Sequence, residues 1–319
     1  MSGKAEPYRT VGRQSRKDRS DHASDNLLAA PQAHKLECFR AVLAPSMKAL
    51  LLAVLAAYFN AAIHSVLAFV NKRKALQRVS DLSLALGFGL HTTALIADWV
   101  IDRRYPLLSL RETLSFLAWT VVATYAVVLY RYGAQALGVI ALPLVSLLTF
   151  VSIFIRSGPT NAIGEISGSS AKWLFPMHTT LLSFAYAAFF VVFVSSVMYL
   201  LQERELKLKT FSAIFHRLPS LTTVNDIATT AATIGLTLLT LGIATGMLWS
   251  SSRDGRLWHN DPKEVFAALT WLLYLALIAY RSTARWRGRR AAWLGVVGFV
   301  LVVCTFLGPR LMDSYHVFG

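Results

Sequence analysis

Histidine is the residue type whose placement in this chain points most directly to chemistry. Of the 8 histidines, His178 opens an apolar run in "FPMHTTLLSFAYAAF" and His316 lies near the C-terminus in "LMDSYHVFG". His91 lies in the middle of another apolar run, "GFGLHTTALIADW". Imidazole nitrogens bind metals, and two of them can take both axial positions of a haem iron. A histidine in an apolar segment can equally be a hydrogen-bonded structural residue, so the pattern alone leaves both interpretations open.

A second candidate feature is the stretch "LWHNDPKEVFAALTWLLY", residues 257–274. Asp261 is a good N-cap, Pro262 suits the first helical position, and Glu264 completes a capping box. The preceding loop places Trp249 and Trp258 among polar residues, and tryptophan is common at membrane boundaries. The tetrapeptide therefore predicts a helix start. In the expected topology these two tryptophans lie at the same end of the bundle as His178 and His316. We therefore expect them to offer flat aromatic surfaces beside a ligand site.

The elements that position these residues are expected to be transmembrane helices. The chain has 319 residues, of which 55% are hydrophobic and 15% charged, and its mean hydropathy is +0.49. A soluble chain would carry charge on about a quarter of its residues. Runs of about 20 apolar residues match the bilayer core, and such segments must be helical. The sequence predicts an all-α, polytopic integral membrane helical bundle with about eight transmembrane helices, near 47–70, 81–101, 112–131, 136–156, 178–201, 227–249, 264–281 and 291–308.

The basic residues of the loops indicate an orientation. One set of loops carries 14 Lys and Arg residues and the other carries 9. The more basic set is expected to face the cytoplasm, which places His178, Trp258 and His316 on the outer, periplasmic face of a multi-pass protein in the cell inner (cytoplasmic) membrane. The net charge of +15 is spread over loops on both faces, which argues against a nucleic-acid partner and leaves membrane lipid as the surrounding medium.

The chain is expected to divide into a polar N-terminal segment and a single membrane domain, and its cysteines exclude covalent self-attachment of haem. The segment 1–46 carries 8 more basic residues, lacks periodicity and is expected to be a disordered, dispensable polar extension. Residues 47–319 are expected to form a single transmembrane domain. The 2 cysteines, Cys38 and Cys304, form no Cys-x-x-Cys-His motif, so the chain is not expected to attach haem to itself covalently.

The loop and its following helix resemble a known family. "GMLWSSSRDGRLWHNDPKEVFAALTWLLY" (246–274) is similar to the tryptophan-rich (WWD) loop of the CcsA-type cytochrome c assembly proteins. The matching positions are Gly246, Trp249, Gly255, Trp258, Asp261, Pro262, Lys263, Glu264, Ala267, Thr270 and Trp271. Residues 91–119, the segment opening with His178 and the segment containing His316 also resemble this family, so the likeness covers roughly 47–319.

The resemblance implies handling of haem b, bound transiently and without a covalent bond. His178 and His316 would be the axial ligands of the haem iron, Trp249 and Trp258 would pack near the porphyrin, and Asp261 would organise the loop. The partners would be a CcsB-type membrane protein and an apocytochrome c whose Cys-x-x-Cys-His thiols add to the haem vinyl groups. The chain would then be a membrane component of a cytochrome c haem lyase (synthetase), and whether it is itself an enzyme stays open.

This sequence departs from the family pattern at several positions. Asp254 and Asn260 stand where the family has two further loop tryptophans, and Ala279 stands where a histidine often holds haem within the membrane. His91, with His64 as an alternative, then becomes the candidate for an intramembrane haem ligand. These departures fit a second function, that of a HemX-like regulator of haem biosynthesis. A third function, transport of haem or another small molecule, also stays open.

Overall fold

The computed structural model describes residues 46–102, 105, 107–155, 173–209, 215–259, 261–282 and 288–311. It divides into two compact units, Met1–Ala49 and Leu50–Gly319. Every predicted site residue belongs to the second unit. Residues 1–45 lie outside the described ranges, so the disordered polar extension remains a prediction.

The prediction of an all-α bundle of about eight spans is confirmed. Within the described ranges there is no strand, and eight helices are long and apolar enough to cross a membrane. The long helices are Ser46–Asn71, α2 (Lys74–Asp102), α3 (Leu110–Tyr132), α4 (Gly138–Phe154), α6 (Leu174–Leu208), α7 (Leu221–Asp254), α8 (Pro262–Ser282) and α9 (Arg289–Leu311), with short 3₁₀ turns at η1 (Gln135–Leu137) and η2 (Phe215–Arg217).

Local signals in the sequence set several helix ends. α3 begins with a capping box in which Ser109 accepts from the backbone of Glu112 and Glu112 accepts from the backbone of Ser109. α3 stops at Gly133 and α7 stops at Gly255, which have φ angles of 62° and 71°. Glycine suits these positions because a left-handed backbone carries no steric cost without a Cβ.

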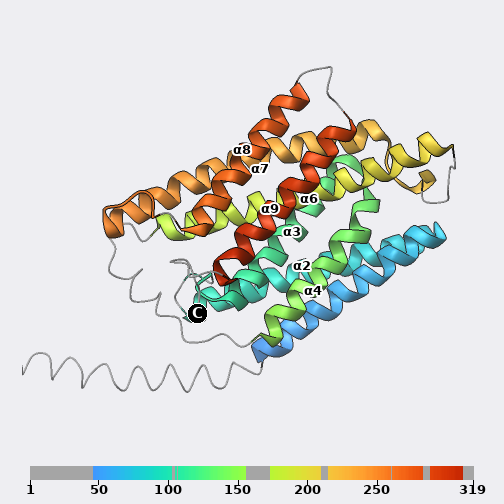
Figure 1. Cartoon of the computed structure of the whole chain (residues 1–319). Coiled ribbons are helices and arrows are strands. Elements are labelled where there is room, and N and C mark those ends of the chain that lie inside the picture. The colour runs from blue at the N-terminus through green and yellow to red at the C-terminus, as the bar shows by residue number, and fades with distance from the viewer. Residues whose placement is uncertain are drawn as a thin grey trace, which may run out of the picture. The chain divides into compact units, whose positions relative to one another are not determined.

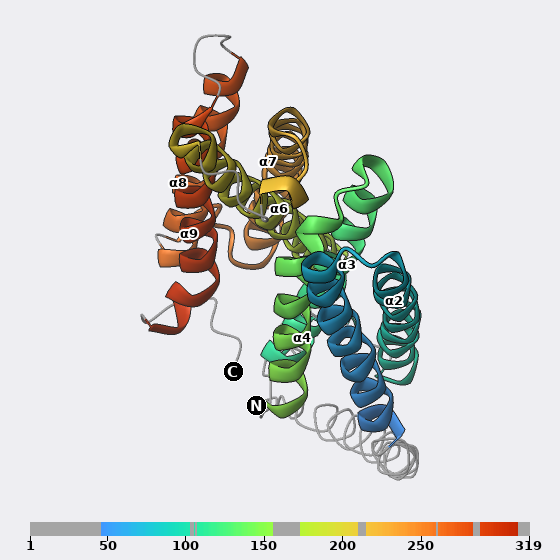
Figure 2. The same ribbon diagram turned by 90° about the vertical axis from the view of Figure 1, so that its right-hand side faces the viewer.

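α6 is the central helix of the bundle. It contacts α7, α9 and α3, while α3 also pairs with α4, and α8 packs on α9 and α7. The two groups of helices, the first helix with α2–α4 and then α6–α9, are visible in Figures 1 and 2. A stacked pair, Phe189 of α6 and Tyr274 of α8, joins the second group with its ring centroids 3.7 Å apart.

Successive spans run in opposite directions, so alternate connections meet at the same end of the bundle. One end contains the start of α6 with His178, the end of α7 with Trp249, and the start of α8 with Asp261. The same end contains the end of α2, the start of α3 and the end of α4. We call this the His178 end. The fold therefore collects at one membrane boundary the three segments that carry the predicted site.

Candidate functional site

His178 is held in a defined orientation by α7. Its Nδ1 lies 2.7 Å from the carbonyl oxygen of Gly242. A carbonyl oxygen only accepts, so Nδ1 carries the proton and donates, and the lone pair lies on Nε2. A backbone carbonyl that fixes the tautomer and the ring in this way is typical of metal-ligating histidines. The half-buried His178 is thus prepared to offer Nε2 as a ligand atom.

The imidazole occupies space that a glycine leaves open. A Cβ added to Gly246 would lie 2.5 Å from both Cε1 and Nδ1 of His178. A Cβ added to Gly242 would lie 2.7 Å from Leu182 of α6. Gly242 and Gly246 thus let α7 approach α6 closely, and the space at Gly246 also accommodates the imidazole of His178.

Trp249 lies one turn beyond Gly246 and packs between helices. Its ring contacts Phe175 of α6 with centroids 5.2 Å apart, and the Arg253 guanidinium lies 4.7 Å from the ring centroid. Its indole Nε1 is buried and has no hydrogen-bond partner among the described residues. Trp249 thus supports the wall next to His178, with a phenyl ring and a guanidinium already against its ring.

Trp258 has a different setting in the loop between α7 and α8. Its side chain is 42% exposed, and it follows the left-handed turn at Gly255. Trp173, at the start of α6, is 62% exposed at the same end of the bundle. The structure therefore separates the two predicted tryptophans: Trp249 is packed against α6, and Trp258 offers a flat surface at the membrane boundary.

The predicted helix start at Asp261 is confirmed, and Glu264 makes one backbone hydrogen bond more than the capping box requires. Asp261 Oδ1 accepts from the backbone N–H of Lys263 at 2.8 Å, and α8 begins at Pro262. Glu264 Oε2 accepts from the backbone N–H of Asp261 at 3.3 Å and from that of His259 at 2.8 Å. Its Oε1 also lies 3.5 Å from His259 Nδ1. Asp261 is only 4% exposed, so its carboxylate stabilises the helix start from inside the fold.

His91 lies among the helices of the first group. It is fully buried, with Nδ1 3.2 Å from the Tyr58 hydroxyl and Nε2 2.9 Å from the Ser115 hydroxyl. Iron ligation by His91 would have to displace one of these hydrogen bonds. The alternative His64 lies on the same helix as Tyr58, and its Nδ1 is 2.9 Å from the carbonyl of Asn60.

The remaining positions considered for haem binding are His316 and Ala279. His316 lies outside the described residues. Ala279 is exposed on α8, so a side chain at this position faces away from the α6–α9 packing. Within the described ranges, no three His, Cys, Asp or Glu side chains gather into a metal site.

Sequence reasoning missed Tyr105 and Thr180. Their hydroxyl groups are hydrogen-bonded, which ties the α2–α3 connection to α6 two residues after His178. Burial raises the pKa of the Tyr105 phenol above its ordinary value. The motif "HTT" could have drawn attention to Thr180, but no local pattern indicates that Tyr105 reaches it.

Comparisons with known proteins agree on one family. A family model described as cytochrome C assembly protein matches residues 107–316. A cytochrome c biogenesis protein CcsA from Prochlorococcus marinus is 27% identical over 78% of this chain and 87% of its own length. Proteins of the same name from Mesostigma viride and Guillardia theta are each 26% identical, over 81% and 72% of this chain and 91% and 81% of their own lengths.

Proposed function

The chain belongs to the cytochrome c assembly protein family and acts in cytochrome c maturation, and from this premise we propose that it presents haem for covalent attachment to an apocytochrome c. The relatives are named for cytochrome c biogenesis, which favours this role over regulation of haem synthesis and over simple transport. Haem is then the substrate that the chain holds, orients and releases.

The observation that carries the proposal is the way in which α7 holds the imidazole ring of His178. The Nδ1–H···O=C bond to Gly242 and the space at Gly246 fix the ring with its lone pair on Nε2. We assign Nε2 of His178 as one axial ligand of the haem iron and His316, in the C-terminal segment, as the other. Two neutral imidazoles favour low-spin haem, and the second ligand sits on a segment separate from the α6–α7 pair.

The loop residues are assigned different tasks. Trp258, exposed at the membrane boundary, offers a flat surface on which a porphyrin can stack. Trp249 keeps the α6–α7 wall behind His178 in place through Phe175 and Arg253. Asp261 and Glu264 hold the loop and the start of α8, so that Trp258 is presented at a constant position. None of these residues is assigned acid–base chemistry.

The reaction needs no covalent participation of this chain. The haem supplies two vinyl groups and an iron, and each Cys thiol of a Cys-x-x-Cys-His segment adds across one vinyl group, with S–C bond formation and the thiol hydrogen passing to the neighbouring carbon. The chain binds and orients the porphyrin and excludes water from its faces. Haem b fits this scheme because its vinyl groups are intact. A CcsB-type membrane protein is the proposed partner in a haem lyase (synthetase).

The proposed location is the cell inner (cytoplasmic) membrane, with the His178 end on the outer, periplasmic side. The excess of Lys and Arg in the opposite loops supports this orientation. Because Ala279 is exposed on α8 and His91 has hydrogen bonds at both nitrogens, we assign no intramembrane haem ligand to the described part of the chain.

An absorption spectrum tests the ligand assignment. The full chain, purified in mild detergent after expression with haem available, should show a reduced low-spin bis-histidine spectrum. His178→Ala combined with His316→Ala should abolish it, whereas His64→Ala should not. A chain that carries no haem, or a double variant with an unchanged spectrum, would contradict the site.

A complementation experiment tests the function itself. The gene should restore covalent cytochrome c in a strain deficient in this family, and the double histidine variant should not. Restoration by the double variant would separate the maturation role from His178 and His316. Failure of the unaltered gene, together with altered haem synthesis, would instead favour the regulatory alternative.

A further inference from the structure

The carbonyl oxygen of Gly242 has a second side-chain donor besides His178. The hydroxyl of Thr245, one turn later on α7, lies 2.9 Å from this oxygen and also 2.9 Å from the carbonyl oxygen of Leu241. Thr245 is only 6% exposed, so bulk water does not compete for its proton. The oxygen that orients the imidazole of His178 is therefore shared with a buried hydroxyl group.

The Gly242 carbonyl is surrounded by more donors than it can serve fully. A carbonyl oxygen has two lone pairs, and in a regular α-helix it accepts from the N–H four residues later. The same oxygen lies 2.7 Å from Nδ1 of His178 and 2.9 Å from the Thr245 hydroxyl. Each further donor draws electron density from the oxygen and weakens its other hydrogen bonds. The bond to His178 therefore depends on where Thr245 directs its proton.

Thr245 differs from other threonines of the same helix. Four of them donate to the carbonyl four residues earlier, at 2.8 to 3.0 Å, and to no second carbonyl among the described residues: Thr229, Thr233, Thr237 and Thr240. Thr245 instead has two acceptors at equal distance. Rotation about its C–O bond moves the proton between Leu241 and Gly242 without any movement of the helix.

The imidazole of His178 is packed too closely to withdraw from this competition. Its Nδ1 and Cε1 lie where a Cβ on Gly246 would be 2.5 Å away, directly against the α7 backbone. A change in the acceptor therefore alters the strength of the hydrogen bond more than the position of the ring. A stronger Nδ1–H···O bond makes the imidazole more basic, so that Nε2 becomes a stronger electron donor to a bound metal.

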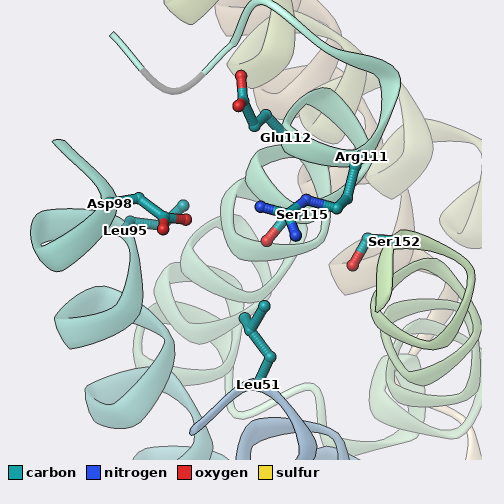
Figure 3. Close-up of a pocket in the computed structure, with 7 residues that line it drawn as sticks. All are labelled: Leu51, Leu95, Asp98, Arg111, Glu112, Ser115 and Ser152. Carbon is teal, nitrogen blue, oxygen red and sulfur yellow. The ribbon is translucent and has the colours of Figure 1, made fainter. Parts of the chain in front are cut away.

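The buried histidine of the first helix group has partners of another kind. Nδ1 of His91 lies 3.2 Å from the Tyr58 hydroxyl, and Nε2 lies 2.9 Å from the Ser115 hydroxyl. Ser115 lines a small pocket among the first helix, α2, α3 and α4 (Figure 3). A hydroxyl group can donate or accept, so these partners do not determine the tautomer as the carbonyl of Gly242 does for His178. Control of one ring nitrogen through a carbonyl at the other therefore belongs to the His178 site.

We propose that Thr245 is a positioning residue for His178, whose hydroxyl shares the Gly242 carbonyl and thereby limits the strength of the Nδ1–H···O=C hydrogen bond. This role rests on the proposed function, in which His178 is an axial ligand of haem iron. A strong electron donor stabilises ferric iron more than ferrous iron, and hydrogen bonds to an axial ligand tune the potential in this way. Thr245 therefore raises the reduction potential of the bound haem and favours its ferrous state.

Reduction potentials of the haem-loaded full chain in mild detergent test the proposal. Thr245→Val removes the hydroxyl and nearly keeps the shape of the side chain. We expect its potential to fall, with the ratio of ferric to ferrous affinity rising about threefold to tenfold, or about 30–60 mV for one electron. Thr245→Ser keeps the hydroxyl and should keep the potential of the unaltered chain. Thr149→Val is the matched control, because Thr149 is also buried and donates to a carbonyl four residues earlier, on α4.

Nuclear magnetic resonance of the full chain prepared without haem measures the hydrogen bond itself. In protein with isotope-labelled histidine, the Nδ1 proton of His178 is identified by its loss in His178→Ala. This resonance should move downfield in Thr245→Val and stay in place in Thr245→Ser. An unchanged resonance in Thr245→Val would overturn the role of Thr245, whether or not the chain binds haem. A downfield shift in a chain that binds no haem would contradict the proposed function and leave the control of the hydrogen bond by Thr245 supported.

The remaining outcomes separate the hydroxyl from packing. An unchanged or more positive potential in Thr245→Val, with the low-spin spectrum intact, would overturn the proposal. An equal fall of the potential in Thr245→Ser would assign the effect to the lost methyl group and would overturn it as well. Thermal unfolding identifies any variant that fails to fold. Thr245→Ala, which also lacks the hydroxyl, then takes the place of Thr245→Val with the same expected fall.

Discussion

The Nδ1 atom of His178 on α6 lies 2.7 Å from the carbonyl oxygen of Gly242 on α7. This single contact joins the two helices that frame the proposed haem site and determines which imidazole nitrogen can bind iron. It also makes the site depend on α7 residues that do not touch the ligand themselves.

Gly246→Ala should impair haem binding without removing a ligand. The added Cβ would meet Cε1 and Nδ1 of His178 at 2.5 Å, so the ring has to leave its hydrogen bond to Gly242. Loss of an orienting contact to a metal-bound histidine typically weakens binding about 10–100-fold. The measurement is haem per purified chain from the absorption spectrum. Gly89→Ala is the matched control, because nothing lies within 4 Å of its added Cβ. Equal haem content in the two variants would contradict the prediction.

Glu264→Gln should loosen the α7–α8 loop. The carboxylate accepts from the backbone N–H groups of His259 and Asp261, and the neutral amide makes weaker hydrogen bonds. We expect a loss of about 1–3 kcal/mol of stability in this region. Thermal unfolding and proteolysis at the loop measure it. Glu203→Gln is the control, since Glu203 pairs with the exposed side chains of Lys207 and Arg289, and its loss should cost about 0–1 kcal/mol. Similar losses in both would show that the Glu264 contacts are unimportant.

His91→Phe should reduce stability and leave the haem spectrum unchanged. The substitution removes hydrogen bonds to Tyr58 and Ser115 in the first helix group. Hydrogen bonds between membrane helices contribute about 0.6 kcal/mol on average and up to about 2 kcal/mol. Thermal unfolding in detergent should therefore shift modestly, and Tyr58→Phe should produce a similar but smaller shift. Loss of the low-spin spectrum in His91→Phe would reinstate His91 as a haem ligand.

The free energy of unfolding should fall at alkaline pH because of the buried phenol of Tyr105. Burial raises its pKa above the ordinary value of 10.0, so the folded chain keeps a proton that the unfolded chain has lost. Unfolding then releases protons, and stability is present in full below pH 10 and declines as the pH rises above it. Tyr105→Phe should flatten this decline. Melting temperatures of both proteins at pH 8 and pH 11 provide the measurement, and an identical alkaline loss in Tyr105→Phe would assign the effect to other groups.

The helix starts show how far local sequence reaches. Asp261, Pro262 and Glu264 predict the start of α8 correctly, because capping depends on residues within one turn of each other. The same pattern did not indicate that Glu264 also binds the backbone of His259, five residues earlier. That contact depends on the path of the loop after Gly255, which local spacing does not specify.

Apolar run length and the loop motif were enough to predict eight helical spans, with His178, Trp249, Trp258 and Asp261 at one membrane boundary. These follow from apolar run length and from the need of each span to satisfy its own backbone. The faces that meet, His178 against Gly242 and Trp249 against Phe175, became known from the packing of the helices. The physical reason is that a helix apolar on every side has no periodicity to indicate its inner face, so its rotation and register are set by packing with its neighbours.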